Sequence, residues 1–96
     1  DFKEFRCGWE IAEKAMLEGG WDLIVLDEFC YAFWYDFLTF AEFERVLENK
    51  TSSLEVVITG RKAPRELIER ADLVSEVRCV KHPFQKGISA REGIEF

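Results

Sequence analysis

The sequence predicts an α/β fold in which helices cover a mostly parallel sheet. Segments with helical apolar spacing alternate with short β-branched segments, in the order helix, strand, helix, strand, helix, strand. The first short segment, Leu23–Leu26, is apolar at every position, which is typical of a parallel strand buried on both faces. The chain has 96 residues, which corresponds to one domain or part of one, and we treat residues 1–96 as a single domain.

The first expected element is a helix that ends at a pair of glycines. Its apolar residues lie three or four positions apart and therefore form one stripe. These residues are Phe2, Phe5, Trp9, Ala12 and Met16. Gly19 and Gly20 supply the C-terminal cap, and the strand Leu23–Leu26 follows.

An aromatic stretch separates the first two strands. It comprises Phe29, Tyr31, Phe33, Trp34, Tyr35, Phe37 and Phe40. A short helix is expected to open here, and a second runs from about Thr39 to Asn49, where Thr39 and Glu42 have the spacing of a capping box. We assign most of these rings to the core. Tyr31 and Tyr35 are better candidates for lining an apolar cofactor pocket, because each hydroxyl needs a polar partner.

Three further elements are expected in the second half of the chain. Leu54–Thr59 is β-branched and predicts the second strand. Pro64 suits the first position of a helix that runs to about Arg70. This helix is expected to bury Leu67, Ile68 and Ala71. Leu73–Val80 alternates in polarity and predicts a third strand, whereas Lys81–Phe96 is expected to be a loop.

Composition excludes several classes of protein. The chain is 48% hydrophobic and 33% charged, which excludes intrinsic disorder. No apolar run approaches the roughly 20 residues that span a bilayer. A net charge of −6 argues against a nucleic-acid binder. Three cysteines without a Cys-x-x-Cys pair argue against a disulfide framework or a zinc site and favour a reducing cytoplasm.

Two adjacent carboxylates, Asp27 and Glu28, follow the first strand. In parallel sheets, ligands bind at the carboxyl ends of the strands, and Mg²⁺ is commonly held by one or two carboxylates together with substrate phosphates. An apolar strand followed by Asp-Glu is the Walker B pattern of P-loop nucleotide-binding proteins. The alternative is that both residues only cap the following helix. The local pattern does not separate these interpretations.

Thr59, Gly60 and Arg61 follow the second strand and are expected at the same edge. A glycine allows the backbone to approach a ligand, and a guanidinium can bind phosphate in a bidentate manner. The alternative is that Gly60 only turns the chain and Arg61 is solvated. His82, the only histidine, precedes a proline, and we interpret it as a hydrogen-bonded loop residue rather than a general base or metal ligand.

The phosphate-binding motif Gly-x-x-x-x-Gly-Lys-Ser/Thr is absent from the sequence. None of the six glycines is followed by Lys-Ser or Lys-Thr. A nucleotide fold of the P-loop type needs this loop to hold the phosphates. The 96 residues are therefore expected to lack the part of the site that grips the triphosphate.

Four strings together resemble one enzyme family. They are DLIVLDEF, YAFWYDFL, VVITGRKAPRELIERADLVSEV and VKHPFQKGISAREGIEF. They are similar to the second half of the ATP:cob(I)alamin adenosyltransferases of the corrinoid-salvage type. The resemblance implies a three-layer P-loop (RecA-like) fold that here lacks its N-terminal strands and phosphate loop. Trp34 is bulkier than the usual family residue, and Arg91 stands where the family usually carries glutamine.

The resemblance also implies an activity and its substrates. Co(I) of reduced cobalamin attacks the 5′ carbon of ATP, and triphosphate leaves. Glu28 then resembles the Mg²⁺ ligand, with Asp27 beside it, and residues 59–61 fall at the nucleotide crevice. We expect no activity from the 96 residues alone. The alternatives are half of a generic P-loop ATPase domain, or a non-catalytic module that binds corrinoid or promotes oligomerisation.

A chain without the neighbouring phosphate-loop strand leaves an open apolar edge on Leu23–Leu26. We therefore expect this chain either to pair with a second copy, as a homodimer, or to form part of a longer polypeptide. Its expected partners are small molecules, ATP and cob(I)alamin, with no nucleic acid and no membrane.

Overall fold

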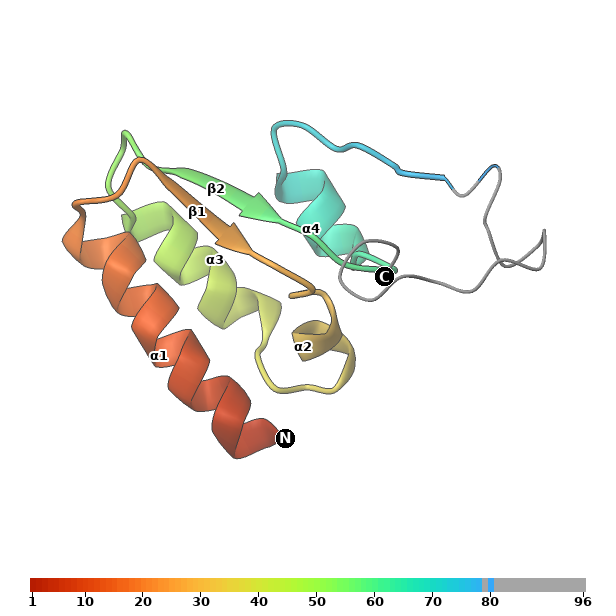
Figure 1. Ribbon diagram of the computed structural model, residues 1–96, viewed down its shortest axis with the longest axis horizontal. Coiled ribbons are helices and arrows are strands. Elements are labelled where there is room, and N and C mark those ends of the chain that lie inside the picture. Colours follow the sequence, from red (N-terminus) through yellow and green to blue (C-terminus); the bar gives the residue numbers. More distant parts are fainter. Residues whose placement is uncertain (79, 81–96) are drawn as a thin grey trace, which may run out of the picture.

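The computed structural model describes residues 1–78 and 80, and it confirms the α/β class (Figure 1). Four helices and two strands alternate along the described chain. They are α1 (Phe2–Glu18), β1 (Leu23–Leu26), α2 (Tyr31–Trp34), α3 (Phe40–Asn49), β2 (Glu55–Ile58) and α4 (Arg65–Arg70). Within this part of the chain, no helix is both long enough and apolar enough to cross a bilayer.

The two strands form a parallel pair, as expected. Ile24 lies opposite Val56, and Leu26 lies opposite Ile58. These four side chains belong to or pack against the hydrophobic core. Helices α1 and α3 lie next to each other across one face of the pair (Figure 1), so the core is the layer between these helices and the sheet.

Aromatic side chains fill this layer. Phe43 of α3 is completely buried, and its ring centroid lies 5.9 Å from Trp9 and 5.6 Å from Phe29. Phe5, Trp9 and Met16 of α1 are buried as predicted, whereas Phe2 at the helix start is 53% exposed. The prediction that most of the aromatic stretch belongs to the core is therefore confirmed for its phenylalanines.

Local sequence signals account for the helix ends. The Asp1 carboxylate accepts a hydrogen bond from the Glu4 amide at 3.0 Å and caps α1, which ends at Gly19 with a φ of 84°. Thr39 caps α3 by accepting from the Glu42 amide at 3.1 Å. The Glu42 side chain pairs instead with Arg6 of α1 at 3.2 Å, so half of the predicted capping box joins two helices.

The prediction that β1 is buried on both faces is wrong. Leu23 and Val25 are 53% and 52% exposed, and Val57 of β2 is 43% exposed on the same face. The reason is that α1 and α3 cover only one face, and the described residues supply no helical layer for the other. The continuous apolar run identifies a strand, but it does not determine what covers that strand.

The predicted third strand is also wrong for the residues that the structure describes. Residues 73–78 form no strand, and Leu73 and Val77 are 83% and 97% exposed. Alternating polarity determines which side chains share a face, but a strand forms only where its backbone pairs with a neighbouring strand, and residues 73–78 pair with none of the described strands. The predicted loop Lys81–Phe96 lies outside the described residues.

Helix α4 differs slightly from its prediction. Pro64 is its N-cap, with a ψ of 150°, so the helix begins at Arg65 instead. Leu67 is buried as predicted, but Ile68 is 46% exposed and Ala71 is exposed. The helix has only 6 residues, and it buries one side chain rather than a full apolar stripe.

Candidate functional site

The carboxyl ends of β1 and β2 are joined by hydrogen bonds that continue beyond the strands. Because Leu26 pairs with Ile58, the residues that follow each strand lie side by side. The Thr59 amide donates to the Leu26 carbonyl oxygen at 3.1 Å, and the Thr59 carbonyl accepts from the Phe29 amide at 2.8 Å. The two segments singled out in the sequence therefore meet at one edge of the sheet.

The Thr59 hydroxyl connects the two adjacent acids. It donates to Oδ1 of Asp27 at 2.6 Å and accepts from the backbone amide of Glu28 at 2.8 Å. All three residues are exposed. The structure thus brings Asp27, Glu28 and Thr59 into one polar cluster, although the parts that we predicted for them in ligand binding remain predictions.

The alternative interpretation of the two acids, that they only cap the next helix, is wrong. Cys30 is the N-cap of α2, and no side chain caps this helix through a hydrogen bond. The Asp27 carboxylate instead accepts from Thr59. The acids are therefore positioned by the neighbouring strand end rather than by the helix that follows them.

Three residues in these loops, Glu28, Gly60 and Lys62, have a positive φ. Glu28 has a φ of 53°, which carries a cost for a residue with a side chain. Gly60 has a φ of 152°, and a Cβ atom there would lie 2.8 Å from both Cβ and Sγ of Cys30. Glycine is therefore required at position 60 for its conformation and for the close approach of the two loops.

Cys30 also lies at this site, although no sequence pattern marked it as a site residue. It is 2% exposed and lies beneath the Gly60 loop. Burial raises the pKa of the Cys30 thiol, and the Glu28 carboxylate raises it further. In the sequence, the glycine at position 60 is the signal for the contact between Gly60 and Cys30. This signal can be interpreted only when the positions of the two loops are known.

Arg61 is exposed, and the described residues give it neither an ion pair nor a hydrogen bond. Its side chain is consequently not held against Asp27 or Glu28. Of the three residues predicted after the second strand, Thr59 and Gly60 make specific contacts with the Asp27–Cys30 segment. Arg61 remains a predicted nucleotide contact at the same strand end.

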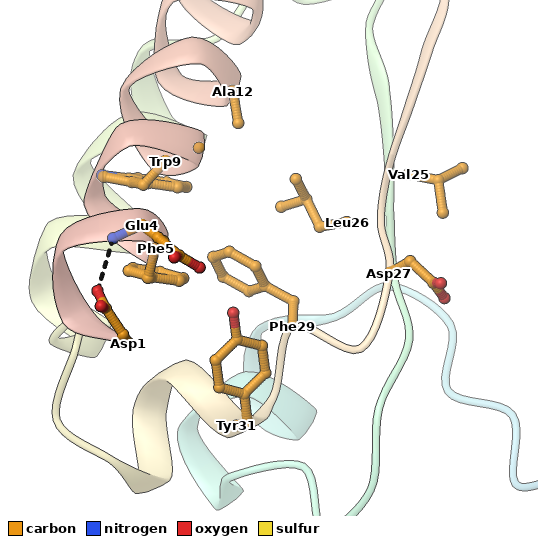
Figure 2. A pocket seen from close by; sticks show the side chains of 11 residues that line it. Asp1, Glu4, Phe5, Trp9, Ala12, Val25, Leu26, Asp27, Phe29 and Tyr31 are labelled. Carbon is orange, nitrogen blue, oxygen red and sulfur yellow. Dashed lines mark hydrogen bonds between the residues drawn. The ribbon is translucent and has the colours of Figure 1, made fainter.

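A pocket of about 350 Å³ lies between α1 and β1 (Figure 2). Leu26 and Phe29 point toward α1, whereas Val25 and Asp27 point away from it. Tyr31 lines this pocket and is 42% exposed. Tyr35 does not line it and is 68% exposed, with its ring 6.3 Å from that of Tyr31. The two tyrosines that the sequence grouped together are therefore neighbours, but only Tyr31 lines the pocket.

The donor set suits a hydrated magnesium ion that shares its coordination with a substrate. No group of three or more His, Cys, Asp or Glu side chains within the described residues is arranged to bind a metal. Two carboxylates, Asp27 and Glu28, are present, and one oxygen of Asp27 is not engaged by Thr59. Mg²⁺ typically keeps several waters and takes one or two carboxylates plus phosphate oxygens. These residues fit that arrangement.

The fold and this polar edge are those of an α/β ligand-binding protein. Acids and a threonine gather at the carboxyl edge of a parallel sheet, which is where α/β proteins bind their ligands. Residues 1–96 match the family described as ATP:corrinoid adenosyltransferase BtuR/CobO/CobP. The chain belongs to this family.

Curated relatives agree with this assignment. A corrinoid adenosyltransferase of Sinorhizobium sp is 44% identical over 92% of this chain, and one of Escherichia coli K12 is 38% identical over 92%. A third, from Pseudomonas aeruginosa, is 36% identical over 100% of the chain. The matched regions make up 42%, 45% and 47% of these three proteins, so the chain spans less than half of their length.

Proposed function

We propose that the complete natural protein transfers the 5′-deoxyadenosyl group of ATP to the Co(I) centre of a corrinoid such as cobalamin. The observation that carries this proposal is the family match over residues 1–96. In the reaction, an electron pair of Co(I) forms the bond to C5′ of ATP. The bond between C5′ and its oxygen breaks, and triphosphate leaves with the electron pair of this C–O bond.

In this mechanism, Asp27 and Glu28 are the residues that would hold Mg²⁺ beside the phosphates. Both acids lie at the carboxyl end of β1, and Thr59 links them to β2. The ion supplies positive charge that neutralises the leaving triphosphate when it is bound. Gly60 keeps the second loop close to the first, and Arg61 supplies a cation that is free to approach a phosphate.

The aromatic surface beside this edge is the part of the chain that we propose for corrinoid contact. Tyr31 and Tyr35 are both exposed, and their rings adjoin Phe37 at 6.2 and 5.7 Å. A flat, partly apolar surface with hydroxyl groups suits a corrin ring, which has apolar faces and polar amide side chains.

We place the protein in a reducing cytoplasm, since the described cysteines Cys7 and Cys30 carry free thiols.

The test is to supply the complete natural protein with chemically reduced cobalamin and MgATP. Adenosylcobalamin and triphosphate should form in equal amounts, and Glu28→Gln should reduce the rate strongly while Glu48→Gln, on the exposed side of α3, should not. Absence of adenosylcobalamin with the unsubstituted protein would contradict the proposal.

The 96-residue chain alone should not catalyse the transfer. It contains no Gly-x-x-x-x-Gly-Lys-Ser/Thr motif, so nothing in it is expected to hold the triphosphate in line with Co(I). Conversion of reduced cobalamin by this chain alone would overturn that expectation.

The second candidate is a non-catalytic module that binds corrinoid or promotes oligomerisation, and the exposed face of the sheet supports it. Leu23, Val25 and Val57 present an apolar surface of a kind that marks interaction sites. Calorimetric titration of the 96-residue chain separates the candidates. Binding of cobalamin without nucleotide favours the module, whereas binding of neither cobalamin nor MgATP by this chain argues against the module.

A further inference from the structure

Thr59 occupies an unusual position between the two acids, because a single hydroxyl serves both of them. A threonine hydroxyl has one proton to donate and two lone pairs with which to accept. Its proton goes to Oδ1 of Asp27 at 2.6 Å, and one lone pair accepts from the Glu28 amide at 2.8 Å. At most one lone pair remains for a ligand, and the hydroxyl has no proton left to donate to a phosphate oxygen.

The backbone of Thr59 is engaged by the same segment. Its amide donates to the Leu26 carbonyl and its carbonyl accepts from the Phe29 amide. Four hydrogen bonds therefore attach Thr59 to residues 26–29. The two backbone bonds place the side chain, and the hydroxyl then selects the orientation of the Asp27 carboxylate.

We infer that Thr59 is a positioning residue for the metal-binding acids rather than a direct nucleotide contact. Its hydroxyl holds one oxygen of Asp27 and so directs the other toward the ion, and it holds the amide of Glu28 while that residue keeps its left-handed backbone, with a φ of 53°. The inference rests on the proposed role of Asp27 and Glu28 in holding Mg²⁺.

A merely structural role would have a different signature. Thr59, Asp27 and Glu28 are all exposed, so loss of the hydroxyl should change the thermal unfolding temperature only slightly. Partners that orient a metal ligand, in contrast, typically change metal affinity by roughly 10–100-fold when they are removed. Affinity for the ion and stability of the fold should therefore respond differently.

The experiment measures binding of Mn²⁺, as a paramagnetic substitute for Mg²⁺, to the complete natural protein in the presence of ATP. Thr59→Val keeps the shape of the side chain and removes the hydroxyl, whereas Thr59→Ser keeps the hydroxyl. Thr51→Val is the matched control, since Thr51 precedes β2 and so lies at the opposite end of the parallel strands from the acids. Asp27→Asn, with and without Thr59→Val, completes a double-mutant cycle.

Thr59→Val should weaken Mn²⁺ binding roughly 10-fold or more, while Thr59→Ser and Thr51→Val should bind as the unsubstituted protein does. In the Asp27→Asn background, Thr59→Val should have a smaller further effect, because the part of its influence that passes through Asp27 is already lost. Unchanged Mn²⁺ binding by a folded Thr59→Val protein overturns the inference. If Thr59→Val does not fold, weakened binding by Thr59→Ser overturns it. Absence of Mn²⁺ binding by the unsubstituted protein contradicts the proposed metal site itself, which distinguishes that failure from failure of the inference.

Discussion

The two faces of the β1–β2 pair differ in what contacts them, although both are largely apolar. On one face, Leu26 packs into a core that contains Trp9, Phe29 and Phe43. On the other, Leu23, Val25 and Val57 are about half exposed. The difference shows that the stability of the described fold comes from one side of the sheet. The other face is available for a further contact. The polar residues Asp27, Glu28 and Thr59 lie at the carboxyl ends of the strands, at the edge shared by both faces.

Removal of the completely buried Phe43 ring should disrupt the packed face of the sheet. Phe43→Ala is expected to lower the free energy of unfolding by about 3–5 kcal/mol, because Phe43 is fully buried against Trp9, Phe29 and Phe33. Phe2→Ala is the matched control, since Phe2 is 53% exposed. Equal losses for the two variants in a denaturation experiment would contradict the described core.

Two glycine substitutions test the close approach of the loops that follow β1 and β2. Gly60→Ala should cost about 1–3 kcal/mol, since its φ is 152° and the new Cβ would lie 2.8 Å from Cys30. Gly8→Ala should instead stabilise the protein by about 0.5–1 kcal/mol, because Gly8 lies inside α1 with no atom near the new Cβ. The sign of each change can be read from urea denaturation, and a stabilising Gly60→Ala would exclude the close approach of the two loops.

Thiol chemistry distinguishes the inside of the molecule from its surface. Iodoacetamide should modify Cys7 at least roughly ten times faster than Cys30 at pH 8, since only the thiolate reacts. Cys7 is exposed, whereas Cys30 is buried. Burial and the Glu28 carboxylate raise the Cys30 pKa, so its thiolate fraction is lower at this pH and increases as the pH rises. Peptide mapping after timed labelling measures both rates, and equal rates would contradict the burial of Cys30.

The exposed face should show the smallest change in stability. Val25→Thr and Val57→Thr are each expected to change the free energy of unfolding of the 96-residue chain by less than about 0.5 kcal/mol, because both residues are exposed. Both should nevertheless shift the chain toward monomer in sedimentation velocity, because they reduce the apolar surface available for association. A chain that is already monomeric at high concentration, before substitution, would contradict this expectation.

Sequence reasoning predicted the elements whose signals are local. The apolar stripe of α1, the Thr39 cap of α3 and the all-apolar β1 each depend on residues within one segment, and each was confirmed. The prediction of a third strand at residues 73–80 was wrong for the described residues because pairing depends on a distant edge. The exposed face of β1 could not be predicted either, because its exposure depends on which helices cover the sheet.

The candidate site shows the same limit. Asp27, Glu28 and Thr59 could be selected because they follow apolar strands, and parallel strands place such residues together. The hydrogen bond from Thr59 to Asp27 depends on the register of the two strands, which neither strand specifies alone. The contact between Gly60 and Cys30 joins residues 30 positions apart and depends on the path of both loops.

The backbone around the strand ends also has a consequence for how the protein can change. The described residues include three non-glycine residues with positive φ, Glu28, Asp36 and Lys62, and each follows β1, α2 or β2 in a connecting loop. Glycine would relieve the strain at any of them. Glu28→Gly should therefore produce a protein that is at least as stable and lacks the carboxylate that we propose for metal binding. Selection for stability alone would favour loss of Glu28. Retention of Glu28 in a lineage would therefore indicate that its carboxylate serves a function.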